Sequence, residues 1–291
     1  MSLSGDPWRA KELKAVLDSS TSKPSEARVY DYWLGGACNW AIDREFGDQA
    51  IARYPDMPMI AQENRKFLYR AVSHLLRRGI RQFVDIGSGV PTSGNVHQIA
   101  ERENPGQARV IYIDHDPIAH AHATILLDEE GDPDRHRALC ADLLDYSELW
   151  RQVLDTGVIN PAEPIGLLMV AVLHFVKPDR RPEDAVEFYR DQLPPGSFLV
   201  LSHGSGEGLS EEQLAAAEKV RASYEANATS ASWFRSRAEI ERFFGGWPIL
   251  EPGITWTATW SDGVITADFT GDDPARSFIL AGIAEKPESP R

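Results

Sequence analysis

The chain has 291 residues, a formal net charge of −14 and an apolar share of 42%, enough to bury one large core with an appended subdomain. Its acidic balance, without a basic cluster, argues against general electrostatic binding of nucleic acid or an anionic membrane. Cys38 and Cys140 have no metal or redox spacing, and the longest apolar stretch, 165–176, is too short to span a bilayer. We therefore predict a cytoplasmic protein that acts on a small molecule.

The first quarter of the chain is predicted to differ in organisation from the rest. Residues 1–24 are polar and are expected to be mobile, although 8–17 has the pattern of a short helix. From residue 25 the sequence becomes helical and aromatic, and a longer amphipathic helix is expected over 59–78. We interpret 25–79 as a helical lid or subdomain and 80–291 as the main domain.

Aromatic residues are concentrated at the start of this lid. Aromatic faces attract a sulfonium or quaternary ammonium cation and exclude water from a site. Core packing of an amino-terminal helix would use the same residues. We expect a mixture in which Tyr30 and Trp33 pack while Tyr32, Asn39 and Trp40 face a ligand site.

A glycine turn follows an apolar strand at 83–89, which reads Phe-Val-Asp-Ile-Gly-Ser-Gly. Gly87 and Gly89, on either side of Ser88, allow backbone N–H groups to approach a ligand closely. A carboxylate at Asp85 repels a pyrophosphate but attracts an ammonium group, such as the amino-acid end of S-adenosylmethionine. Tight strand-to-helix turns also use glycine for purely structural reasons, so this motif alone is weak evidence.

A second acidic residue closes the next predicted strand. Residues 109–113 read as a buried parallel strand that ends at Asp114 and is followed by His115. In an open α/β sheet ligands bind outside the carboxyl ends of the strands, where an acid at this position can accept both ribose hydroxyls. Asp116 is expected instead to cap a helix that begins near Pro117.

A third predicted strand, near 138–141, ends in Asp142 and Leu143. Such a pair can hold an adenine, the acid by hydrogen bonding the amino group and the leucine by packing against the ring. A loop carboxylate beside a core leucine is the alternative. Acids at three successive strand ends favour the binding interpretation.

The histidines after the second strand also raise the question of a metal site, because imidazole and carboxylate suit zinc or iron. His120 and His122 are two residues apart on a predicted helix and therefore point in different directions, and His115 precedes that helix. We predict no metal.

Strands and helices alternate through the middle of the chain. Strands near residues 83, 111, 139, 168 and 199 alternate with helices near 95, 121, 149 and 186, which is typical of parallel βαβ units. Two capping-box patterns then mark helices after Ser210 and Ser236. At 254–260, threonines alternate with apolar residues, and 277–284 is an apolar run. Together they predict an antiparallel hairpin at the sheet edge. The expected fold is α/β, a doubly wound and mainly parallel sheet.

Together these motifs resemble the class I S-adenosylmethionine-dependent methyltransferases. The successive motifs of that class are matched in order by residues 83–89, 111–116, 142–143, 167–174 and 195–203. More narrowly, the chain resembles an actinobacterial methyltransferase family formerly catalogued as a domain of unknown function. That closer resemblance covers nearly the whole chain after Ser25, and it is carried by residues 27–36, 39, 43, 63–68, 85–97, 112–117 and 171–176.

The resemblance implies a seven-stranded Rossmann-like sheet with a reversed final hairpin. It implies S-adenosylmethionine as the cofactor and S-adenosylhomocysteine as the product. The cofactor contacts that it implies are Asp85, Gly87, Gly89, Asp114, His115, Asp142 and Leu143. It implies no particular methyl acceptor.

Four residues are candidates for contact with the methyl acceptor. Methyl transfer is an in-line attack on a sulfonium methyl, so the protein has to align the acceptor and, for some acceptors, remove a proton. His174 and His203, just past the fourth and fifth strands, are candidate bases, with packing at a strand end as the alternative. Asn64 and Arg65 are a candidate pair for a carboxylate, with a solvated helix face as the alternative.

Three classes of function are compatible with these residues. The leading one is a small-molecule methyltransferase, with a role in specialised metabolism. The second is a regulatory protein that binds S-adenosylmethionine or S-adenosylhomocysteine without methyl transfer. The third is a nicotinamide oxidoreductase, which is disfavoured because Thr92 stands where the dinucleotide fingerprint requires its third glycine. The oligomeric state stays open.

Overall fold

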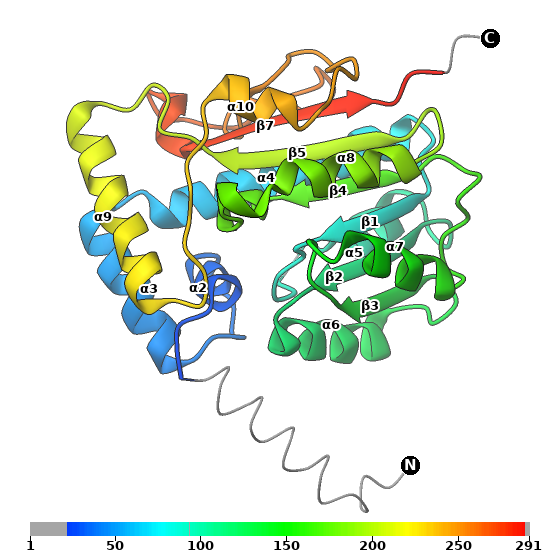
Figure 1. Ribbon diagram of the computed structural model, residues 1–291, viewed down its shortest axis with the longest axis horizontal. Helices are drawn as coiled ribbons and strands as arrows, with labels where there is room; N and C mark the ends of the chain where they lie inside the picture. Colours follow the sequence, from blue (N-terminus) through cyan, green and yellow to red (C-terminus); the bar gives the residue numbers. More distant parts are fainter. Residues whose placement is uncertain (1–21, 93, 289–291) are drawn as a thin grey trace, which may run out of the picture.

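A seven-stranded sheet forms the centre of the protein, for which a computed structural model describes residues 22–92 and 94–288 (Figure 1). The strand order is β3-β2-β1-β4-β5-β7-β6, in which the first five strands are parallel and β7 runs antiparallel to β5 and β6. The strands are β1 (Gln82–Ile86), β2 (Arg109–Asp114), β3 (His136–Cys140), β4 (Gly166–Val170), β5 (Phe198–Gly204), β6 (Thr255–Trp256) and β7 (Ile279–Glu285). The predicted Rossmann-like sheet with a reversed final hairpin is confirmed.

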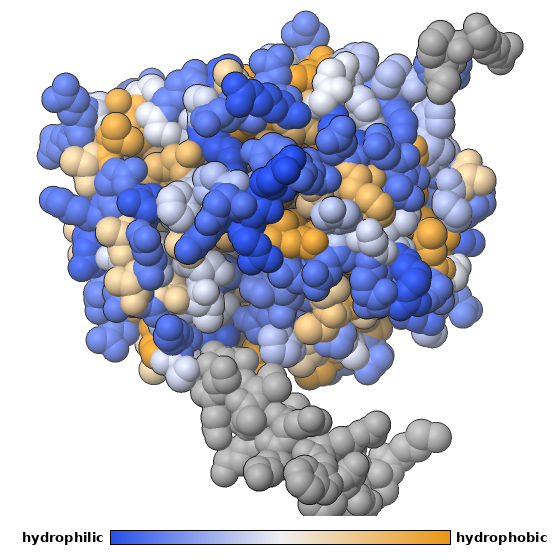
Figure 2. All heavy atoms as spheres, in the orientation of Figure 1, coloured by the Kyte–Doolittle hydropathy of each residue, from blue (hydrophilic) through white to orange (hydrophobic). Residues whose placement is uncertain are grey.

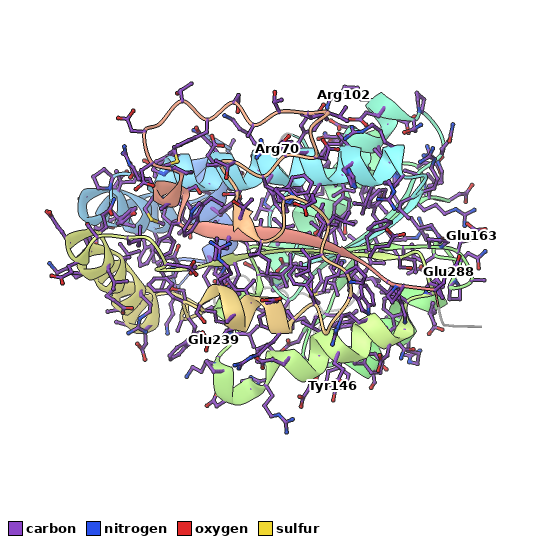
Figure 3. The ribbon with its side chains drawn as sticks, turned by 90° about the horizontal axis from the view of Figure 1, so that it is seen from above. Arg70, Arg102, Tyr146, Glu163, Glu239 and Glu288 are labelled. Carbon is purple, nitrogen blue, oxygen red and sulfur yellow. The ribbon has the colours of Figure 1, made fainter. Side chains whose placement is uncertain are left out.

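Helices cover both faces of this sheet, because side chains of the buried strands alternate between two apolar layers. One face carries α4 (Met57–Arg77), α5 (Val96–Glu103) and α6 (Pro117–Glu130). The other carries α7 (Tyr146–Asp155), α8 (Pro182–Gln192) and α10 (Arg237–Arg242). Figure 3, seen from above, shows Arg70 of α4 and Tyr146 of α7 on opposite sides of the sheet.

A third apolar cluster lies beside the sheet, at the left of Figure 1. It joins α2 (Glu26–Trp33), α3 (Ala41–Arg53), the first turns of α4, and α9 (Glu211–Asn227). Because α4 packs both in this cluster and against the sheet, residues 25–79 share a core with the rest of the chain. The division at residue 79 stays a prediction.

Most expected elements are present in the structure. The helix expected over 59–78 is α4, and both capping boxes are formed, Ser210 with Gln213 and Ser236 with Glu239. Asp116 caps α6 by accepting a hydrogen bond from the backbone N–H of Ile118. The helix expected over 8–17 and the mobility expected for residues 1–21 lie outside the described residues.

The strand expected over 254–260 is shorter than predicted. β6 ends at Trp256, whose carbonyl accepts hydrogen bonds from the N–H groups of Thr259 and Trp260, so the chain turns there. This turn carries the Trp260 ring onto Phe67 of α4, where it is fully buried. Burial of a tryptophan therefore outweighs four further residues of edge strand, 257–260.

Three short 3₁₀ helices complete the described fold: η1 (Leu173–Phe175), η2 (Pro178–Arg180) and η3 (Pro274–Ser277). In the described part of the chain, no helix combines the length and apolar character needed to cross a bilayer. The face shown in Figure 2 is mostly hydrophilic, with apolar residues in small groups. Scattered apolar residues of this kind are ordinary on a protein surface.

Candidate cofactor and acceptor site

A cavity of about 190 Å³ lies where the carboxyl ends of β1, β2 and β4 face α2, α4 and α9. One wall consists of residues 87–90, 114–116 and 170–172, which directly follow or end these three strands. Open α/β sheets bind ligands at this edge.

The glycine loop after β1 is held against β2 by its backbone. The N–H groups of Gly87 and Ser88 both donate to the carbonyl of Ile113, at 2.8 and 3.1 Å. Gly87 has φ +75°, and a Cβ there would lie 2.3 Å from Cγ2 of Val172. The loop therefore requires glycine at this position for both conformation and space.

Asp85, at the end of β1, is a buried carboxylate without a hydrogen bond from any described residue, and it lines the cavity. Burial raises its pKa to about 7, the nearby charge of Asp114 adds to this rise, and Arg65 opposes it. Arg65 donates to the Thr92 hydroxyl at 3.3 Å, and its buried Nε has no partner among the described residues. A carboxylate and a guanidinium with unused hydrogen-bonding capacity suit the ammonium and carboxylate of an amino acid.

Asp114, at the end of β2, orders the same loop. Its Oδ2 accepts from the N–H of Gly89 at 2.8 Å, and its Oδ1 accepts from the N–H of Asp116 at 2.9 Å. Burial raises its pKa, and these two hydrogen bonds oppose the rise. Each oxygen keeps a lone pair with which to accept a ribose hydroxyl. The exposed His115 ring lies 3.6 Å from Asp114 and 3.8 Å from Glu26 of α2.

The third predicted pair, Asp142 and Leu143, does not line this cavity. Oδ1 of Asp142 accepts from the N–H of Leu144 at 2.9 Å, in the turn that leads to α7. Leu143 packs against the sheet core, and its carbonyl accepts from the Tyr189 hydroxyl at 2.7 Å. Their contact with an adenine stays a prediction.

The expected division of the lid aromatics is correct only in part. Tyr30 and Trp33 pack in the third apolar cluster as expected, but they also line the cavity, and the three residues expected to face it do not. Tyr32 instead donates to Asp48 at 2.6 Å on the surface, the Asn39 amide donates to Asp31 at 2.8 Å, and Trp40 stacks on the guanidinium of Arg28. The reason is helical phase: on α2, positions 26, 30 and 33 share one face, and position 32 faces away from it.

Asn64 and Arg65 both line the cavity, so a solvated helix face does not describe them. Nδ2 of Asn64 donates to the Tyr30 hydroxyl at 3.0 Å, and Oδ1 of Asn64 accepts from Ser202 at 2.7 Å. The Ser202 hydroxyl in turn accepts from the N–H of Ala171, a residue with φ +57° just past β4. This chain of hydrogen bonds couples α2 to the strand ends.

The two candidate bases have different surroundings. His203 is fully buried and outside the cavity: Nδ1 donates to the Gly204 carbonyl at 2.8 Å, and Nε2 accepts from Arg235 at 2.7 Å. With both nitrogens occupied, His203 has none left for an acceptor, which corrects that candidate. His174 lines the cavity, and its Nδ1 accepts from the N–H of Gly204 at 3.4 Å. Its proton is then on Nε2, and burial together with Arg235 lowers its pKa to about 3.

The far wall of the cavity contains residues that sequence reasoning missed. They come from α9, from the segment after it and from the end of η3: Val220, Tyr224, Ser232, Phe234 and Phe278. The apolar face of α9, with residues 217, 220 and 224 at helical spacing, was a usable signal for a packed helix. Nothing in the sequence indicated that this face meets the carboxyl ends of β1 and β2.

A buried ion cluster ties the lid to the start of α6. Nε of Arg28 donates to Asp43 at 2.8 Å, its Nη1 lies 3.6 Å from Asp116, and its Nη2 donates to the Lys23 carbonyl at 3.0 Å. The Ser25 hydroxyl donates to Asp116 at 2.9 Å. The cavity wall formed by α2 is thereby held against the cofactor-binding edge of the sheet.

Replacing Arg28 with methionine is expected to lower the free energy of unfolding by about 3–5 kcal/mol, because the buried carboxylate of Asp43 loses its charged partner and keeps only backbone N–H donors. Urea denaturation of the full chain measures this. As a control, replacing the exposed Arg44 with methionine is expected to lower the free energy of unfolding by under about 1 kcal/mol. Similar losses for both variants would show that the cluster contributes little to stability.

The described residues contain no group of three or more potential metal ligands. The fold, the glycine loop and the unpartnered Asp85 beside Arg65 together define a Rossmann-like methyltransferase site for a zwitterionic nucleoside cofactor. Comparisons with known proteins agree with this class. A family profile described as S-adenosyl methyltransferase matches residues 11–287, and the chain belongs to this family.

Two crystal structures are similar over most of the chain. One is a protein from Thermobifida fusca YX provisionally described as a methyltransferase, with 36% identity and a TM-score of 0.80 over 92% of this chain and 96% of that one. The other is a DUF574 family protein from Streptomyces avermitilis MA-4680, with 33% identity and a TM-score of 0.83 over 92% and 99%.

A more distant structure, an O-methyltransferase family protein from Burkholderia thailandensis, has 14% identity and a TM-score of 0.52 over 84% of this chain and 63% of that one, and it supports the fold alone. A search of curated protein sequences gives no match. The protein is thus an S-adenosylmethionine-dependent methyltransferase.

Proposed function

We propose that this enzyme methylates a small, largely apolar aromatic molecule of the kind made in specialised metabolism. The observation that carries the proposal is the composition of the cavity wall opposite the glycine loop. That wall contains five aromatic rings, which are Trp33, Phe175, Tyr224, Phe234 and Phe278. Aromatic side chains in a concave site favour a flat apolar ligand over a peptide or a sugar.

The two sides of the cavity suit two different ligands. Asp85 and Arg65 would hold the amino-acid end of S-adenosylmethionine, and Asp114 would hold its ribose. When bound, this cofactor supplies an electrophilic methyl group. The aromatic wall then has two tasks, to align the acceptor for in-line attack and to exclude water.

The proposed reaction uses no side chain as a dedicated general base. With a pKa of about 3, His174 is neutral at physiological pH and a poor proton acceptor for a hydroxyl group. Its Nε2–H is suited to donating a hydrogen bond. Alignment by the cavity wall is therefore proposed to contribute more to the rate than proton transfer to a side chain.

Thermal unfolding with added ligands tests the cofactor side of this proposal. S-adenosylmethionine and S-adenosylhomocysteine, each at about 100 times its dissociation constant, are expected to raise the melting temperature by roughly 5 °C, whereas NAD is not. A stabilisation by NAD alone would contradict the proposal.

Mass spectrometry of a panel of phenolic and polyketide-like acceptors tests the acceptor side. Addition of one methyl group to an aromatic compound, dependent on S-adenosylmethionine, is the expected result. Tight cofactor binding without turnover of any aromatic compound would instead favour a regulatory protein that only binds the cofactor.

A further inference from the structure

Two hydroxyl groups in the aromatic wall have no hydrogen-bond partner among the described residues. Tyr224 of α9 and Ser232 in the following segment both line the cavity, and they are 4% and 8% exposed. No described residue donates to or accepts from either side-chain hydroxyl. A hydroxyl that lines a cavity and has no protein partner is free to exchange hydrogen bonds with a bound ligand.

These two residues and His174 are grouped around Phe175. The Phe175 ring lies 5.9 Å from the Tyr224 ring and 4.4 Å from the His174 ring, between ring centroids. The N–H of Trp233 donates to the His174 carbonyl at 2.7 Å, which places the neighbouring Ser232 next to η1. Three polar groups from distant parts of the chain thus share one apolar wall.

All three groups are neutral, and each can donate a hydrogen bond. Burial and the charge of Glu26 raise the pKa of Tyr224, so its phenol keeps its proton. His174 carries its proton on Nε2, because Nδ1 accepts from Gly204. Two cations lie nearby: Arg221 is paired with Glu218 at 2.6 Å and with Glu225 at 3.3 Å, and Arg235, which does not line the cavity, donates to His203 and to the carbonyls of Leu173 and Val176.

We propose that Tyr224, Ser232 and His174 form a hydrogen-bonding edge that binds an uncharged oxygen group of the aromatic acceptor, such as a phenol hydroxyl or a ring carbonyl. This inference rests on the proposed function and narrows its substrate class to oxygenated aromatic molecules. A carboxylate is disfavoured, because Glu26 lines the same cavity and Arg65, a cation that also lines it, is assigned to the carboxylate of the cofactor. These residues are specificity-determining, since they select and orient the acceptor.

Binding of three matched probes to the full chain saturated with S-adenosylhomocysteine tests the proposal. The probes are naphthalene, 1-naphthol and 1-naphthoate, which share one ring system and differ in the oxygen group. Calorimetry or fluorescence titration is expected to show that 1-naphthol binds at least about tenfold more tightly than either of the other two.

Two variants test whether the preference for 1-naphthol depends on these hydroxyl groups. Tyr224→Phe keeps the ring that packs on Phe46 and Phe175, and it is expected to weaken 1-naphthol about five- to tenfold while leaving naphthalene unchanged. Ser232→Ala is expected to act in the same direction. The matched control is Tyr32→Phe, which removes a hydroxyl that bonds Asp48 outside the cavity and is expected to change none of the affinities.

The outcomes separate this inference from the proposed function. If naphthalene and 1-naphthol bind equally, or if 1-naphthoate binds best, the hydrogen-bonding edge is wrong while an aromatic acceptor stands. If Tyr224→Phe and Ser232→Ala both leave the preference for 1-naphthol intact, the edge is also wrong. If S-adenosylhomocysteine binds but none of the three probes does, the aromatic acceptor itself is contradicted, and the edge with it.

Discussion

Replacing Asp85 with asparagine is expected to weaken binding of S-adenosylmethionine by at least about tenfold at pH 8. The carboxylate is buried, lines the cavity and lacks a partner among the described residues, so an ammonium group there gains a charge-assisted hydrogen bond that an amide cannot provide. The substitution keeps the shape of the side chain. Calorimetric titration of the full chain measures the change.

The same variant is expected to remove a pH dependence. Since the pKa of Asp85 in the free protein is raised to about 7, the wild type should lose affinity by about tenfold for each pH unit below 7, as protonation removes the charge. The variant should bind equally across pH 5 to 8. Asp48→Asn, which alters an exposed carboxylate outside the cavity, is the control. A wild-type affinity that is flat over this range would contradict the assigned role.

Linkage gives a second measurement on the unliganded protein. An acid whose pKa rises on folding keeps a proton that the unfolded chain releases, here between about pH 4 and pH 7. The Asp85 contribution to stability is therefore present below pH 4 and is lost as the pH rises through 7. In urea denaturation the wild type should lose this contribution over that range, and Asp85→Asn should not.

The second large effect is expected for Gly87→Ala. The new Cβ would lie 2.3 Å from Val172, in a backbone with φ +75°, so the free energy of unfolding should fall by about 2–5 kcal/mol. Cofactor affinity should fall by at least about tenfold, because relief of the clash moves the loop that lines the cavity and disturbs the hydrogen bond from Gly89 to Asp114. Urea denaturation and titration with S-adenosylhomocysteine measure the two effects.

Gly106→Ala separates the clash from the backbone strain. Gly106 has a similar φ of +72°, but its Cβ would meet nothing within 4 Å, so only the strain of about 1–2 kcal/mol is expected, with no loss of cofactor affinity. The new Cβ would also lie 2.5 Å from Cβ of Val172, so adding Val172→Gly to Gly87→Ala should restore part of the stability. Equal losses in the two glycine variants would show that contact with Val172 is unimportant.

Much of the sheet was predictable because its signals are local. The parallel strands are short, mainly apolar runs, and two of them carry an acidic residue at or next to their last position, Asp85 in β1 and Asp114 in β2. The helix boundaries follow in the same way from Asp116 and the two capping boxes. β6 was overestimated because the burial of Trp260 is a tertiary event that the alternation of residues does not record.

The sequence by itself determined the parallel α/β architecture, the glycine loop and the acidic residues at two strand ends, since these depend on the period of apolar residues and on backbone conformation. Only the tertiary structure decided that Tyr30 rather than Tyr32 lines the cavity, that His203 is hydrogen-bonded to Arg235 outside it, and that Tyr224 lines its far wall. These facts depend on how helices far apart in the chain are rotated and packed, and local periodicity does not encode that rotation.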